Sequence, residues 1–150
     1  MAGCRMRLSW LAGAVLLGLG AAQAHQGATG LLKERMDAME SLGQAMKDIR
    51  RHLVGTRDFA AVGREAAGIA ALARRMPQWF PPGSNAHPSE ALPAIWRKWP
   101  AFQASAAALA EEAEKLGQAA ASGERQAIER QYRALGEVCL ACHRQFRAKR

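Results

Sequence analysis

Apolar residues recur at steps of three and four in four separate stretches of the chain, apart from one step of seven at the start of the first. The stripes run from Leu32 to Leu53, from Phe59 to Met76, from Phe102 to Ala120 and from Ile128 to Phe146. This spacing gives each helix one apolar face and is typical of helices that pack nearly antiparallel. No useful length of the sequence alternates with period two, so the chain is predicted to be all-α.

Turn-forming residues separate the four stretches. Gly55-Thr56 ends the first, with Thr56 or Asp58 as the candidate N-cap of the second, and Ser122-Gly123 divides the third from the fourth. All six prolines fall between Pro77 and Pro100, which predicts one long connection with a short helical turn at Ile95-Trp96. We therefore expect an antiparallel four-helix bundle. The predicted helices are Gly30 to Val54, Asp58 to Met76, Pro100 to Ser122 and Glu124 to Lys149.

The first 24 residues have the pattern of a secretory signal peptide. Arg5 and Arg7 precede an apolar run from Leu8 to Ala22, and Ala22-Gln23-Ala24 supplies a small-x-small cleavage site. A membrane-spanning helix needs about 20 apolar residues, and this run is shorter. The sequence therefore predicts cleavage after Ala24, export to the periplasm, no membrane anchor after cleavage, and a mature domain of residues 25–150.

The basic charge of the chain constrains its partners only in part. Its formal charge of +8 becomes +6 when Arg5 and Arg7 leave with the signal peptide. Such a charge suits an acidic partner or an anionic surface, and it equally suits a solvated basic surface without a partner. No lysine-rich arm or interleaved aromatic and basic pattern is present, so nucleic-acid binding is not expected.

The two cysteines of the mature chain lie together in Cys139-Leu140-Ala141-Cys142-His143. A disulfide across two intervening residues would constrain the unfolded chain little. A thioredoxin-like redox pair would need a βαβ surround, which the sequence lacks. A zinc site needs four ligands, and the other histidines have no paired spacing to complete one.

Covalent haem attachment accounts for all three residues of this motif. Two thiols on one helical turn can bond to the two vinyl groups of the porphyrin, and the adjacent His143 can then lie under the iron as the proximal ligand. Cys139 and Cys142 occupy seam positions of the last predicted helix. We therefore expect one haem c inside the bundle.

A haem-attachment motif on the last helix of a four-helix bundle resembles the cytochrome c′ family, or class II c-type cytochromes. The resemblance covers residues 30 to 150. The segments that carry it are Arg35 and Met39, Phe80-Pro81-Pro82-Gly83-Ser84, Leu92-Pro93-Ala94-Ile95-Trp96, and Cys139-x-x-Cys142-His143-x-x-Phe146-Arg147. The resemblance implies a soluble bacterial periplasmic protein with one haem c, either monomeric or a homodimer.

The family resemblance implies two alternative functions. Low-spin members, in which a methionine of the first helix completes the iron coordination, transfer electrons to and from redox partner proteins. High-spin members leave the sixth position open and bind nitric oxide or carbon monoxide. We expect an electron carrier, with gas binding as the alternative. No motif places an acid–base pair near the iron, so no enzymatic activity is expected.

Met39 is the candidate sixth ligand, because it lies on the same seam as Leu42 and Met46 and should point into the bundle. A core methionine would show the same spacing. Met36, one turn earlier, replaces the glutamine that family members frequently have after the first-helix arginine, and it is the second candidate thioether.

Three further residues are candidates for the haem pocket. Arg35 suits a haem propionate, or is a surface charge. Trp96 resembles a family tryptophan near the haem edge, although a tryptophan packed in the connection would look the same. Arg147 resembles the family arginine beside the proximal histidine, or is an exposed cation at the helix end.

Overall fold

The computed structural model describes residues 30–149 and contains four long helices joined by two short turns and one long connection. The long helices are α1 (Gly30–Arg51), α2 (Phe59–Arg75), α4 (Trp99–Ser122) and α5 (Arg125–Phe146). The predicted boundaries of these helices are confirmed to within three residues at every end. The predicted signal peptide lies outside the described residues. No helix within residues 30–149 is long and apolar enough to cross a membrane.

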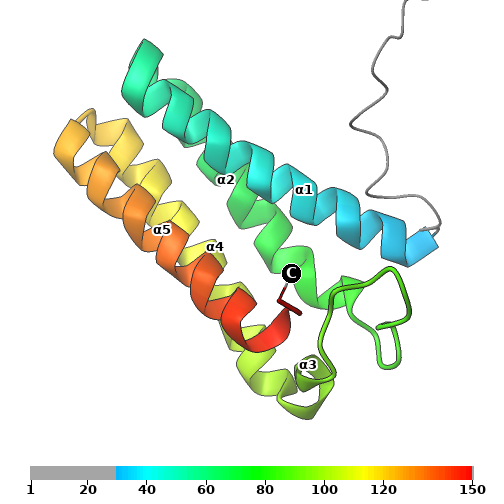
Figure 1. Cartoon of the computed structure of the whole chain (residues 1–150). Helices are drawn as coiled ribbons and strands as arrows, with labels where there is room; N and C mark the ends of the chain where they lie inside the picture. Colours follow the sequence, from blue (N-terminus) through cyan, green and yellow to red (C-terminus); the bar gives the residue numbers. More distant parts are fainter. Residues whose placement is uncertain (1–29, 150) are drawn as a thin grey trace, which may run out of the picture.

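The four helices form an antiparallel bundle in which sequential neighbours pack side by side (Figure 1). α1 packs against α2, α2 against α4, and α4 against α5. The seam residues predicted from the sequence make the core, and its largest fully buried side chains come from all four helices and the connection. They are Ile49, Val62, Ile69, Ile95, Leu116, Ile128 and Leu135.

The α1–α2 turn begins with a short π-helix, η1 (His52–Thr56), that extends α1 beyond Arg51. Arg57 then takes the left-handed conformation with φ 56°, which reverses the chain direction. The side chain of Asp58 accepts a hydrogen bond from the Ala61 amide at 2.9 Å, so Asp58, and not Thr56, is the N-cap of α2.

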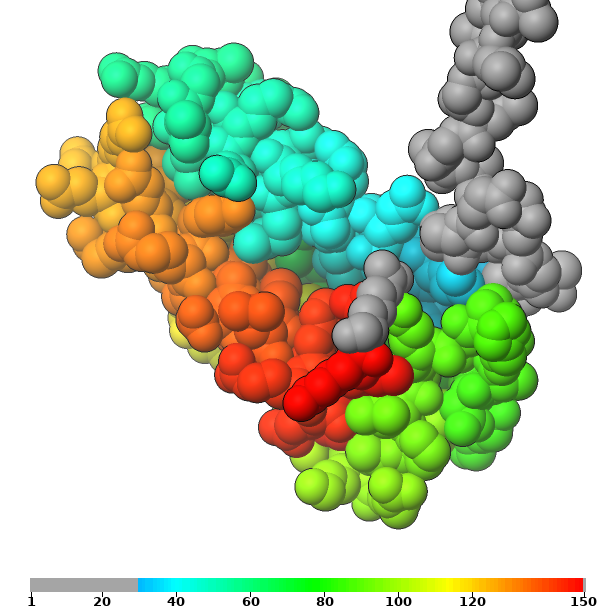
Figure 2. Space-filling model, in the orientation of Figure 1, coloured from blue at the N-terminus to red at the C-terminus, as the bar shows by residue number. Residues whose placement is uncertain are grey.

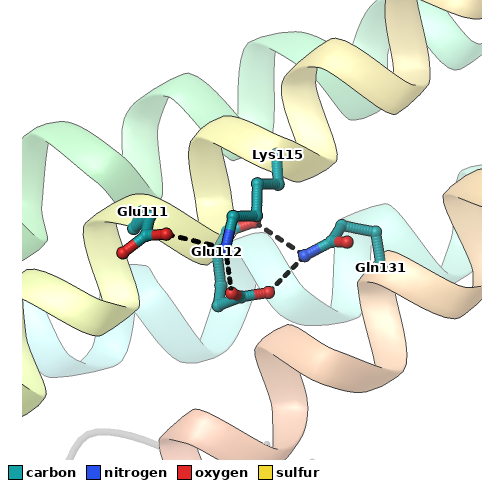
Figure 3. Close-up of polar contacts among 4 residues, drawn as sticks. All are labelled: Glu111, Glu112, Lys115 and Gln131. Atoms are coloured by element: carbon teal, nitrogen blue, oxygen red, sulfur yellow. Dashed lines mark hydrogen bonds and ion pairs between the residues drawn. The ribbon is translucent and has the colours of Figure 1, made fainter.

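Polar side chains link α4 to α5 on the outside of the bundle (Figure 3). Lys115 pairs with Glu111 at 2.7 Å and with Glu112 at 2.8 Å along α4. Glu112 also accepts a hydrogen bond from the Gln131 amide of α5. This cluster ties α4 to α5 through side chains of both helices.

The long connection folds over one end of the bundle and is attached to the end of α5. It contains the short 3₁₀ turn η2 (Met76–Trp79) and the single-turn helix α3 (Ala94–Arg97), which confirms the predicted turn at Ile95-Trp96. The Leu92 amide donates to the Phe146 carbonyl at 2.9 Å, and the Ala148 amide donates to the Glu90 carbonyl at 2.8 Å. These bonds form an isolated antiparallel bridge.

The bridge corrects the predicted end of the last helix. We expected α5 to continue to Lys149, but it ends at Phe146 and Arg147 is extended. The reason is a contact distant in sequence, because the connection offers backbone partners that replace the last helical hydrogen bonds.

Candidate haem site

A cavity of about 580 Å³ lies between α1 and α5. Residues of α2, α4 and the long connection also line it. Figure 2 shows the surface hollowed between the cyan atoms of α1 and the orange-red atoms of α5. The lining is mostly apolar and includes Met39, Leu42, Ile69, Phe102 and Val138. A volume in this range, with apolar walls and a few polar groups, suits a small-molecule or cofactor site.

The two cysteines lie on the α5 wall of this cavity. Cys139 and Cys142 are free thiols, half-buried against the core, and Leu135 and Phe146 of the same stripe are buried. Leu140, between the cysteines, is exposed, so the helix turns only the thiols inward. Burial raises the pKa of Cys139, and burial together with the neighbouring Cys139 raises the pKa of Cys142 to about 11. Both groups are therefore neutral thiols at physiological pH.

His143 lines the same cavity, directly after Cys142. Partial burial and then the nearby charge of Arg147 lower the pKa of His143, while Glu90 opposes the shift. A lower pKa favours the neutral imidazole, which is the form that binds a metal. Within the described residues no cluster of three or more histidine, cysteine or acidic side chains could hold a metal ion, so a bare zinc site has no support there.

Arg35 of α1 is the one charged residue that the described structure buries, at 4% exposure. Its guanidinium donates to the Trp79 carbonyl at 2.9 Å, to the Ser89 hydroxyl at 2.9 Å and to the Ser84 hydroxyl at 2.7 Å. It also lies 4.2 Å from the ring centroid of Phe80. Burial lowers the pKa of Arg35, yet a guanidinium stays charged in proteins.

The partners of Arg35 leave its charge without a counter-ion within residues 30–149. All three of these hydrogen-bond acceptors are neutral, and none of the ion pairs found within residues 30–149 includes Arg35. A buried charge of this kind is costly unless an anion compensates it. Because Arg35 lines the cavity, a cofactor carboxylate placed there would supply that anion, as a haem propionate does.

We predict that Arg35→Ala destabilises the folded protein by about 3 kcal/mol, because it removes charged hydrogen bonds that tie α1 to the long connection. Urea unfolding of the haem-containing protein, followed by circular dichroism, measures this loss. Arg35→Lys should recover only part of it, since an ammonium lacks the fork of donors. The exposed Lys33→Ala is the control and should stay within about 0.5 kcal/mol of wild type. An Arg35→Ala protein as stable as this control would contradict the prediction.

Three methionines of α1 line the cavity opposite α5. Met39 and Met46 pack against the buried core, whereas Met36 lines the cavity without packing against it. Met46 lies beside α5: its Cε would be 4.0 Å from a Cβ added at Gly136, and its carbonyl accepts from the Tyr132 hydroxyl at 3.3 Å. Met39 and Met46 both lie on the predicted seam and line the cavity, and Met39 is the one of the two that the sequence predicts as the sixth ligand.

Two predicted pocket residues take different places. Arg147 lines the cavity, and its Nε donates to a Glu90 oxygen at 2.7 Å. Trp96 does not line the cavity; its indole N–H donates to the carbonyls of Phe80 and Pro81, both at 3.0 Å. These bonds help to hold the connection in shape, and the place of Trp96 at the haem edge stays a prediction.

Sequence reasoning missed three residues of this site. Ser84, Ser89 and Glu90 all lie in the proline-rich connection and contact Arg35 or Arg147. Ser84 ends the family segment that begins at Phe80, but its position in the sequence does not identify it as a partner of Arg35. The other two had no sequence signal, since their contacts depend on how the connection folds back.

The geometry fits a haem held at two thiols of α5, with a histidine beside them and a buried cation for a propionate. The sequence model of the family described as Cytochrome C′ matches residues 31–147. The chain belongs to the cytochrome c′ family. Proteins of this family carry covalently attached haem c, and this chain presents the residues to hold it. When bound, the haem supplies a redox-active iron that can also bind small ligands.

Relatives with two different names are similar to this chain. A cytochrome c′ of Pararhodospirillum photometricum is 32% identical over 115 residues, which cover 75% of this chain and 92% of that protein. A cytochrome c-556 of Agrobacterium fabrum is 31% identical over 147 residues, covering 97% and 99%. Cytochrome c′ from Rhodopseudomonas palustris superposes with a TM-score of 0.74 at 28% identity, covering 82% of this chain and 99% of that one.

Proposed function

We propose that this cytochrome c′ relative is a periplasmic electron carrier in which Met39 and His143 are the two axial ligands of the haem iron. Cys139 and Cys142 would anchor the porphyrin, and Arg35 would pair with a propionate. The proposal includes no enzymatic activity. The signal-like segment of residues 1–24 supports the periplasmic location.

The observation that carries the proposal is the position of Met39. Its thioether lines the cavity from α1, on the wall that faces the α5 motif, and it packs against the core, which limits its freedom. A thioether opposite histidine favours reduced iron and raises the reduction potential, which suits an electron carrier. An iron with both axial positions filled also needs little rearrangement when it gains or loses an electron.

Gas binding is the second candidate, and the apolar lining of the same cavity favours it. If the Met39 sulfur only packs against the iron without bonding, the distal face is an apolar space bounded by side chains such as Leu42 and Ile69. Such a space admits a small neutral ligand such as nitric oxide or carbon monoxide. The names of the relatives, cytochrome c′ and cytochrome c-556, occur at similar identity and do not separate the two functions.

Stopped-flow mixing of the reduced protein with carbon monoxide tests the proposal. If Met39 occupies the sixth position, only the fraction of molecules with the sulfur dissociated can bind the gas. We therefore expect the apparent affinity of wild type to be at least about tenfold below that of Met39→Ala. Equal affinity in the two proteins, with fast binding in both, would reject the electron-carrier proposal and favour the gas binder.

A further inference from the structure

An ion pair joins the long connection to Arg147, which lies one helical turn after His143. The Arg147 Nε donates to Glu90 Oε2 at 2.7 Å, and the Glu90 carbonyl accepts from the Ala148 amide at 2.8 Å. Ala91 and Arg147 form the backbone bridge beside it. Glu90 is therefore fixed against the end of α5 through both its side chain and its backbone.

Both members of this pair lie next to the proximal histidine. Arg147 and Glu90 line the same cavity as His143, and the Arg147 amide donates to the His143 carbonyl at 3.1 Å. His143 therefore shares the cavity with one positive and one negative side chain.

We propose that Glu90 is a positioning residue that holds the Arg147 guanidinium beside His143, and that the two charges together set the reduction potential of the haem. A positive charge near the iron stabilises the reduced state relative to the oxidised state, and a negative charge does the opposite. Together the two side chains of the pair carry no net charge. Removing only one of the two charges would change the net charge beside His143.

This inference is independent of the sixth ligand. It depends on His143 as the proximal ligand, and it holds whether Met39 bonds to the iron or only packs against it. A failure of Met39 as the sixth ligand therefore leaves the inference intact, and the reverse is also true.

Redox titration of the haem-containing protein and three variants tests the inference. Glu90→Gln leaves Arg147 uncompensated and should shift the reduction equilibrium several-fold toward the reduced form. Arg147→Gln removes a positive charge from beside His143 and should shift it several-fold toward the oxidised form. The double variant should return near wild type. A tenfold shift of a one-electron couple corresponds to 59 mV.

The opposite signs separate electrostatics from structural damage. A loosened pocket would shift both single variants in the same direction, and circular dichroism would record any loss of helix. Glu124→Gln is the control, because this exposed acid lies at the other end of α5, 19 residues or about 28 Å from His143. It should leave the potential unchanged.

Each single variant tests the inference alone, so one that fails to mature does not end the experiment. The backbone bonds of Glu90 do not depend on its side chain, which favours folding of Glu90→Gln. Shifts of equal sign, or no shift in either single variant, would overturn the inference.

Discussion

Replacing both Cys139 and Cys142 by alanine is expected to abolish covalent haem attachment completely. The two thiols are the half-buried sulfurs on the α5 wall of the cavity, and no other cysteine lies in the described residues. Wild type, made in a strain with a c-type maturation system, should be red and keep its haem after acid–acetone extraction. Intact-mass spectrometry should find one haem on wild type and none on the double variant.

Leu140→Ala is the matched control for this experiment. It changes an exposed residue between the two cysteines and should leave one haem attached. A colourless wild-type protein, or wild type with one zinc ion per chain, would contradict the haem assignment. Haem that remains on the double variant after extraction would show that the thiols do not hold it.

Met39→Ala is expected to convert the oxidised protein from low-spin to high-spin. If Met39 and His143 are the axial ligands, as proposed, loss of the thioether removes the strong-field ligand opposite His143. It should also lower the reduction potential by on the order of 0.1 V, within the roughly 0.8 V span that axial ligands control. Optical spectroscopy and redox titration measure the two effects.

Met36→Ala is the control for Met39→Ala. Met36 lines the same cavity, one turn earlier, but does not pack against the core. Its replacement should leave a low-spin spectrum and a potential close to that of wild type. If Met36→Ala becomes high-spin and Met39→Ala does not, the ligand assignment is reversed.

Most of the bundle could be predicted from the sequence because each helix carries its own signal. The stripe from Ile128 to Phe146 places Leu135 and the cysteines on one face, and the structure buries or half-buries them. Asp58 carried an N-cap signal that local geometry satisfies. These features depend on residues within a turn or two of one another, which is the range that periodicity describes.

Contacts across the long connection could not be predicted, since they join residues far apart in sequence. Arg35 was singled out for a propionate, but its bonds to Ser84 and Ser89 depend on the path of the connection. The same path gives α5 an earlier end and pairs Glu90 with Arg147. The indole N–H of Trp96 likewise donates to carbonyls of the connection, those of Phe80 and Pro81.

The near-infrared spectrum of the oxidised wild-type protein tests the electron-carrier account most directly. A sulfur bound to ferric iron gives a weak methionine–iron charge-transfer band, which a thioether that merely packs nearby does not. We predict that the band is present in wild type and in Met36→Ala and absent in Met39→Ala. A wild-type spectrum that lacks the band and is high-spin would refute Met39 as ligand and assign the protein to gas binding.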